Sequence, residues 1–271
     1  MDYLMLFKGI IIGIIEGITE FLPVSSTGHM IIAGDIMEFK GEFANLFEIV
    51  IQLGAILAIV VLYNKKIFSS VAGVFKGKKS DFRFWINILV ACIPAGVLGI
   101  LFEDIIDKYL FNTTTVLAAL VVGAILMIVA ERNVKYARNT DLDSITVFQA
   151  FKIGIFQCLA MWPGMSRSAS TIIGGWFSGL STVAATEFSF FLALPVMIGA
   201  SGLKLIKYEG ILSFNEIIIL AVGFIVAFLS ALVCVESFVG YLKKRSMKVF
   251  AYYRIIIAMA LFILSVLGIV S

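Results

Sequence analysis

EGITEFLPVSSTGH (residues 16–29) and PGMSRSAST (residues 163–171) decide the fold, because each places a proline and a run of hydroxyl side chains inside strongly apolar sequence. Each break separates two apolar arms of about 12–18 residues, shorter than the roughly 20 residues that a membrane-spanning helix needs. This pattern favours a re-entrant helical hairpin. A charged side chain at the bilayer centre costs roughly 2.5–3.5 kcal/mol. We therefore expect the charges of Glu16, Glu20 and Arg167 to be paired or hydrated, and to serve a functional site.

The composition is that of an integral membrane protein. Of the 271 residues, 61% are hydrophobic and 14% are charged, whereas a soluble domain is about 45–50% apolar and about 25% charged. The net charge of +3 gives no indication of nucleic-acid binding. Six further runs are long enough to cross a bilayer as helices: about 47–64, 84–102, 114–130, 186–206, 216–238 and 250–270. We predict an all-α integral membrane fold, a single membrane domain over residues 1–271 with six transmembrane helices and two re-entrant helical hairpins.

The order of these elements repeats. A broken hairpin and three spans fill residues 1–135 approximately, and a second broken hairpin and three spans fill about 145–271. An odd number of crossings per half predicts an inverted-topology repeat with the polar site between the halves. Three basic loops, at about 65–83, 131–146 and 239–249, should be cytoplasmic. The hairpin tips would then enter from opposite faces and meet near the midplane, with both termini outside.

Glu16 and Glu20 are spaced i, i+4, so their carboxylates share one face of a helix. Two carboxylates at this depth need a cation, a shared proton or a water-filled cavity. A divalent metal that bridges them to phosphate oxygens would satisfy both. The structural alternative is a pair of carboxylates that hold helices together through hydrogen bonds.

Ser25, Ser26 and Thr27 crowd three hydroxyls into a turn just before His29, the single histidine of the chain. If the turn becomes helical, the imidazole of His29 can reach the Ser26 hydroxyl, which is a nucleophile-plus-base arrangement. The alternative is that the hydroxyls cap a helix and the histidine is a satisfied polar residue.

The second break is typical of an anion site. Gly164 permits close backbone approach, and a helix that begins near Ser168 would aim N–H groups at the loop. Arg167 adds a planar fork suited to phosphate oxygens, and Ser166, Ser168 and Thr171 add donors. The alternative is a capped helix in which Arg167 pairs with a glutamate of the first break.

Two weaker candidates lie elsewhere. Glu48 and Gln52, also i, i+4, open the next span and could line the same cavity or form a structural hydrogen-bond pair. Arg254 lies one turn into the last span, where we expect it to snorkel to the cytoplasmic interface rather than join the site.

Both breaks closely resemble the two signature motifs of the undecaprenyl-diphosphatase, or bacitracin-resistance, family, as does FEIVIQLG at residues 47–54. The resemblance implies a multi-pass enzyme of the bacterial plasma membrane that removes the terminal phosphate of undecaprenyl diphosphate, a polyprenyl lipid, to recycle the carrier for cell-wall synthesis. It also implies bacitracin resistance, a divalent cation such as Mg²⁺ or Ca²⁺, a homodimer and a site open to the outer face.

On this hypothesis Arg167, the backbone of residues 164–168 and a divalent ion hold the diphosphate. Ser26 attacks the terminal phosphorus or positions a water, and His29 handles the proton. Glu16 and Glu20 hold the metal or tune the histidine. The second hypothesis is a transporter that flips undecaprenyl phosphate or moves a small anion, because broken helices and inverted repeats are at least as typical of transporters.

Overall fold

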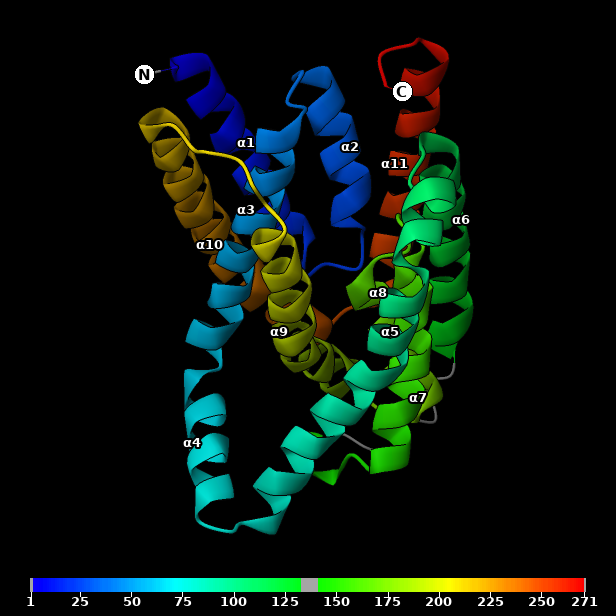
Figure 1. The fold of residues 1–271 in the computed structure, drawn as a ribbon. Coiled ribbons are helices and arrows are strands. Elements are labelled where there is room, and N and C mark those ends of the chain that lie inside the picture. The colour runs from blue at the N-terminus through cyan, green and yellow to red at the C-terminus, as the bar shows by residue number, and fades with distance from the viewer. Residues whose placement is uncertain (1, 133–140, 271) are drawn as a thin grey trace.

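The structure is a computed structural model that describes residues 2–132 and 141–270, and the regular elements of this part are all helices. The helices are α1 (Tyr3–Thr19), α2 (Ser26–Ile36), α3 (Glu42–Leu62), α4 (Asn64–Phe75), α5 (Lys79–Leu110), α6 (Thr113–Ala130), α7 (Val147–Gln157), α8 (Arg167–Phe177), α9 (Thr182–Ile206), α10 (Phe214–Leu242) and α11 (Lys248–Val266), with short 3₁₀ turns η2 (Leu142–Ser144) and η3 (Cys158–Met161). Figure 1 shows them as one bundle with both chain ends at the same end.

Six of these helices are long and apolar enough to cross a membrane, as predicted: α3, α5, α6, α9, α10 and α11. The shortest, α6, has 18 residues, which gives a length of about 27 Å at 1.5 Å per residue. This confirms an all-helical multi-pass membrane fold.

The basic segment at 65–83 is not the loop that we predicted. Helix α4 occupies most of it and α5 begins at Lys79, so that only the short turn at 76–78 is non-helical. The acid-rich stretch from 103 to 110 likewise continues α5. Charge marks where a chain leaves the membrane, but lysine and glutamate are good helix formers, so it does not mark where a helix ends.

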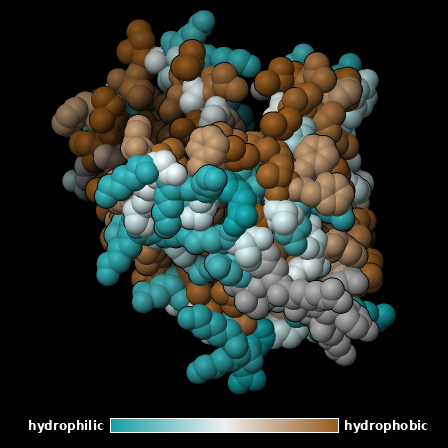
Figure 2. Space-filling model, turned by 90° about the horizontal axis from the view of Figure 1, so that it is seen from below, coloured by the Kyte–Doolittle hydropathy of each residue, from teal (hydrophilic) through white to brown (hydrophobic). Residues whose placement is uncertain are grey.

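The basic segments lie away from the end that carries the termini. Figure 1 shows α4 and the start of α5 at that far end, and Figure 2 shows hydrophilic residues gathered on the corresponding face. The turn after α10 carries Lys243, Lys244 and Arg245. The predicted basic residues Lys135 and Arg138 lie outside the described residues.

Two helix pairs are interrupted where the sequence predicts it. α1 packs against α2, and α7 packs against α8. α1 begins at the end of the bundle with the termini and α2 returns toward it, whereas α7 begins nearer the opposite end (Figure 1). The two connections, at 20–25 and 158–166, interrupt the α-helices, and the second begins with the 3₁₀ turn η3.

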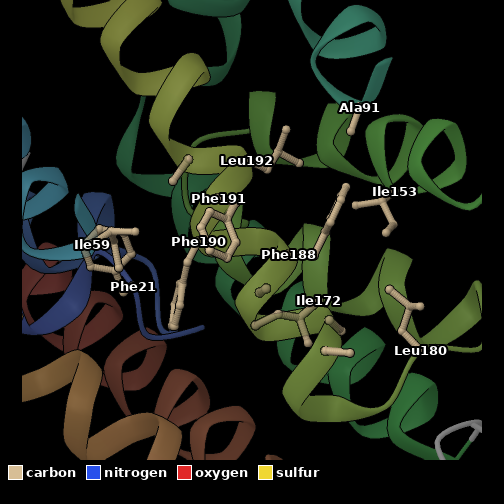
Figure 3. Packing of buried hydrophobic residues seen from close by; sticks show 14 of the residues in the cluster. Phe21, Ile59, Ala91, Ile153, Ile172, Leu180, Phe188, Phe190, Phe191 and Leu192 are labelled. Carbon is tan, nitrogen blue, oxygen red and sulfur yellow. The ribbon is translucent and has the colours of Figure 1, made fainter. Parts of the chain in front are cut away.

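Helix α9 runs through the middle of the bundle and joins the two interrupted pairs. Its buried Phe190 packs edge-on against Phe21 of the first connection, with ring centroids 5.6 Å apart. In Figure 3, Phe188 lies on the other side of α9, toward Ile153 of α7 and Ile172 of α8. A single aromatic helix thus fixes both connections against one core.

Candidate active site

Both connections end in a serine with unusual backbone. Ser25 has φ 71° and Ser166 has φ 70°, in the left-handed region that residues with side chains rarely adopt. Each Oγ accepts a hydrogen bond from the backbone N–H three residues on, at 3.3 Å. Such strain is of order 1–3 kcal/mol per residue, and a serine cap offsets about 1 kcal/mol. The caps make Ser26 and Arg167 the first residues of α2 and α8.

Glu20 joins these two helix starts. Its Oε2 accepts a hydrogen bond from Ser26 Oγ at 2.7 Å, and its Oε1 pairs with Arg167 Nη2 at 3.1 Å. The Glu20 and Arg167 side chains are 6% and 12% exposed. Charge-assisted hydrogen bonds in such a setting are short and strong. The alternative that we stated for Arg167, an ion pair with a glutamate of the first break, is therefore present at rest.

One N–H donor of the Arg167 guanidinium has no partner among the described residues. Nη1 donates to the Ser189 carbonyl at 3.0 Å, and the group lies 5.7 Å from the centre of the Phe21 ring. Nε is buried and has no hydrogen-bond partner among the described residues. A buried, unpaired donor is rare in proteins, and here it points to an anion acceptor.

Glu16 lies one turn before Glu20 on α1 and is 4% exposed. Its carboxyl is close enough to Glu20 to share a hydrogen bond, and Glu48 and Arg167 lie within electrostatic range. The described residues contain no cluster of three or more His, Cys, Asp or Glu side chains that could hold a metal. Two carboxylates do fit Mg²⁺, which keeps several waters and takes its remaining ligands from substrate phosphates.

His29 is placed differently from our expectation. The turn does become helical at Ser26, but the Nδ1 of His29 bonds the Ser25 carbonyl at 2.7 Å and Nε2 bonds the Tyr253 hydroxyl at 2.9 Å. A carbonyl accepts only, so Nδ1 carries a proton, and when the ring is neutral Nε2 accepts from the Tyr253 hydroxyl. The hydroxyl of Ser26 is bonded to Glu20 instead, because α2 turns the imidazole toward α11.

A cavity of about 570 Å³ opens in front of the Glu20–Arg167 pair. The predicted site residues that line it are Glu20, Ser26, Thr27, Gln52, Gly164, Ser166 and Arg167. The predicted residues outside this lining are Glu16, Ser25, His29, Glu48, Ser168 and Thr171. Glu48 is an exposed residue of α3, whereas Gln52, one turn on, accepts a hydrogen bond from Ser201 at 3.4 Å.

Ser168 and Thr171, predicted to hold phosphate, are buried behind the cavity wall. Ser168 Oγ donates to the Leu22 carbonyl at 2.8 Å and so ties the second connection to the first. Thr171 Oγ1 lies 2.7 Å from Ser189 Oγ, beneath the arginine. Their positions on the inner face of α8 suit them to hold Arg167 in place.

Arg254 corrects a second expectation. It does not snorkel: it is fully buried. Its guanidinium donates to the carbonyls of Met165 at 2.8 Å and Gly164 at 3.0 Å in the second connection, and lies 3.5 Å from the carbonyl of Pro23 in the first. Two more bonds, to the Ala119 and Leu120 carbonyls of α6, complete its set. Irregular backbone inside a membrane protein leaves carbonyls in need of donors, and one arginine supplies them here.

Sequence reasoning gave no role to Tyr253, Ser189 or Gln157. The side chain of Gln157 is 2% exposed and lines the cavity, and its Oε1 has no hydrogen-bond partner in the described part of the chain. A polar residue aligned with a glutamate of the other half was a usable signal for Gln157. Tyr253 lies in an apolar span and carried none.

Comparison with known proteins identifies the family. The sequence model of the family described as "Bacitracin resistance protein BacA" matches residues 9–260. The chain belongs to this BacA family. A similar protein of Clostridium tetani, named undecaprenyl-diphosphatase, is 55% identical over 271 residues, with 99% of each chain covered. A relative of Clostridium perfringens with the same name is 49% identical, covering 100% of this chain and 99% of its own. The BacA match spans both connections and Arg254.

Proposed function

We propose that this BacA-family protein is a membrane hydrolase that converts undecaprenyl diphosphate to undecaprenyl phosphate and inorganic phosphate, and that it thereby confers resistance to bacitracin. The relatives carry the name of that activity. The observation that carries the proposal is a serine hydroxyl and an arginine held by one buried glutamate at the wall of a cavity. These groups suit phosphoryl transfer, which needs mainly positioning and charge neutralisation.

Phosphate binding falls to the second connection. The terminal phosphate accepts from the unpaired Nε of Arg167 and lies against the N-terminal turn of α8, where the helix dipole favours an anion. Gly164 has φ 98°, and a Cβ there would lie 2.6 Å from the carbonyl oxygen of Val116, so this position requires glycine. Ser189, Thr171 and Ser168 hold the arginine from behind.

Ser26 is the proposed nucleophile. Glu20 accepts the proton of the Ser26 hydroxyl along the 2.7 Å hydrogen bond as Oγ attacks the terminal phosphorus. The bond from that phosphorus to the bridging oxygen breaks, and undecaprenyl phosphate leaves. Water then attacks the phosphorus of the phosphoserine and the bond from phosphorus to Oγ breaks. Oγ takes its proton back from Glu20, and inorganic phosphate leaves with the oxygen and protons of the water. A divalent cation bound to Glu16 and Glu20 would neutralise phosphate charge. His29 fixes Ser25, and through it the start of α2, from the Tyr253 side.

The proposal extends to topology. The two interrupted helix pairs are re-entrant hairpins of an inverted-topology repeat, whose halves place equivalent serine caps at Ser25 and Ser166. The basic segments face the cytoplasm of the bacterial cell by the positive-inside rule. The cavity, which extends to Lys204 and Lys207 near the end of α9, then opens to the outer face. The assembly is a homodimer.

One experiment separates this function from lipid or anion transport. The purified protein in detergent receives undecaprenyl diphosphate and Mg²⁺, and released phosphate is measured. Detergent abolishes vectorial transport but leaves hydrolysis intact. Phosphate release that depends on Ser26 supports the hydrolase, and no release with any divalent cation would favour the transporter.

A further inference from the structure

The glycines within the helices fall into two groups. Most are sites of close packing: a Cβ at Gly13, for example, would lie 2.9 Å from a carbonyl oxygen of α10. At Gly96 and Gly99 of α5, Gly199 and Gly202 of α9, and Gly240 of α10, an added Cβ would meet no atom of the described chain within 4 Å. A glycine inside a helix costs about 1 kcal/mol relative to alanine. Close packing does not account for these five.

Three of the five, Gly96, Gly99 and Gly199, line the same cavity as Glu20, Ser26 and Arg167. We call these three the bare glycines. Around them the walls of α5 and α9 are built from small or apolar residues: Cys92, Ala95, Ile100, Pro195, Val196 and Ala200. The α5 wall, from 92 to 100, covers about 12 Å along the helix. The cavity therefore has a polar end at the two connections and continues as a slot between α5 and α9, which Lys204 and Lys207 also line near the end of α9.

We propose that this slot, which we call the α5/α9 slot, holds the isoprenoid chain of the substrate next to its diphosphate. The inference rests on the proposed function and names the subsite that function requires. The bare glycines leave open space beside the helix backbone for a methyl-branched chain, and the backbone polar groups of a helix are bonded within the helix. Close contact between the slot and the isoprenoid chain adds many small dispersion attractions to the binding free energy.

Continuity with the polar end selects this occupant. A diphosphate bound at Arg167 fixes where the first carbon of the lipid leaves the site, and the slot begins there. The outer face of α5 beside the slot carries exposed apolar side chains, Ile93, Val97 and Leu101. The far part of the chain can therefore pass from the slot into the bilayer without crossing a polar surface.

The test uses substitutions that narrow the slot and leave the residues of the polar end unchanged. Gly99→Leu and Gly199→Leu should raise the KM for undecaprenyl diphosphate at least tenfold and leave kcat within twofold. The inhibition constant of inorganic pyrophosphate, which has no chain, should stay within twofold. The matched control is Gly240→Leu on α10, where an added Cβ also meets no described atom within 4 Å but the residue lies outside the cavity lining. It should leave all three values within twofold.

Unchanged KM in both slot variants would overturn the inference, and so would an equal loss of pyrophosphate binding, because the polar end would then be disturbed. A second measurement covers variants that fail to fold. Gly99→Cys, in a background with the native cysteines replaced by serine, is modified with a maleimide. Undecaprenyl phosphate should slow the modification at least fivefold, and inorganic phosphate should not. Equal rates with and without the lipid would refute the slot.

The two proposals fail in different ways. If the unmodified protein releases no phosphate, the proposed hydrolase fails, while protection of Gly99→Cys by the lipid still supports the slot. If the unmodified protein is active and the slot variants behave like Gly240→Leu, the hydrolase stands and the slot fails.

Discussion

Glu20 is the residue on which the chemistry converges, because its two carboxylate oxygens serve Ser26 and Arg167 at the same time. Glu20→Gln keeps an acceptor for the hydroxyl but removes the base. We expect kcat for phosphate release to fall at least about 100-fold, within the range that general-base catalysis contributes. Steady-state kinetics in detergent measure the effect.

Ser26→Ala is the companion variant, because it removes the nucleophile and leaves the Glu20–Arg167 pair in place. We expect an equally large loss of kcat with little change in melting temperature. Glu209→Gln, at an exposed site in the loop after α9, is the control for the loss of charge in Glu20→Gln and should keep full activity. An active Ser26→Ala protein would show that water attacks directly.

Among the described residues, only the side chain of Arg254 bonds both connections and α6. Arg254→Lys keeps the charge, but its three donors cannot reach five carbonyls on three segments. Because hydrogen bonds to charged groups contribute about 1.5–3 kcal/mol each, we expect a clear fall in melting temperature in detergent. Arg245→Lys, in the exposed turn after α10, should melt like the unmodified protein. Equal melting of the two variants would contradict this role.

A substitution at Glu16 tests the proposed divalent-cation site. It lies behind the cavity wall beside Glu20, so Glu16→Gln should weaken cation binding and leave the serine in place. We expect the Mg²⁺ concentration for half-maximal activity to rise about tenfold or more. The stabilisation that Mg²⁺ gives against heat should shift by the same factor, since ligands stabilise in proportion to occupancy. A cation dependence that is unchanged in both assays would remove Glu16 from the metal site.

Residue types and their spacing were enough to predict that Glu20, Ser26 and Arg167 lie together. They were not enough for His29 and Arg254. The direction of the imidazole depends on how α2 lies against α11, and the burial of Arg254 depends on where the two connections need donors. Both are consequences of tertiary packing, which local sequence does not encode.

At the scale of elements, α1 is held in place by its contact with α10. A Cβ at Gly17 would overlap the carbonyl oxygen of Ala227, so Gly17→Ala should push α1 outward and move both glutamates. We expect lower thermal stability and lower kcat. Gly240→Ala makes the same change on an open helix face and should be neutral or stabilising by up to about 1 kcal/mol. If both variants melt at the same temperature, close α1–α10 packing is not what positions the glutamates.

Element lengths followed from hydropathy, so the six spans were predictable within a few residues at most ends. Helix α4 was not, because its lysines signal a position outside the membrane core and say little about backbone conformation. The two connections were predictable as breaks from their prolines and hydroxyls. Their left-handed serines were not, since neither Ser25 nor Ser166 is a residue type that favours positive φ.

At the scale of the whole molecule, the site depends on three segments far apart in the chain. The first connection and the start of α2 supply Glu20 and the proposed nucleophile Ser26, the second connection and the start of α8 supply the proposed anion site, and α11 supplies Arg254, which bonds both connections. No segment would make the site alone. A helix that slid along the membrane normal by one turn would separate Ser26 from Arg167, so the intramembrane bonds of Arg254 fix depth as well as distance.

The same arrangement predicts which side of the membrane the cavity faces. Lys76, in the turn after α4, lies at the end away from the termini, and Glu209 lies in the loop after α9, toward which the cavity extends (Figure 1). With Cys92, Cys158 and Cys234 replaced by serine, Glu209→Cys should react with a membrane-impermeant maleimide added to intact spheroplasts. Lys76→Cys should react only after permeabilisation, and the cysteine-free background should not react at all. The reverse pattern would place the cavity mouth on the cytoplasmic side, so that the enzyme would draw its lipid from the inner leaflet.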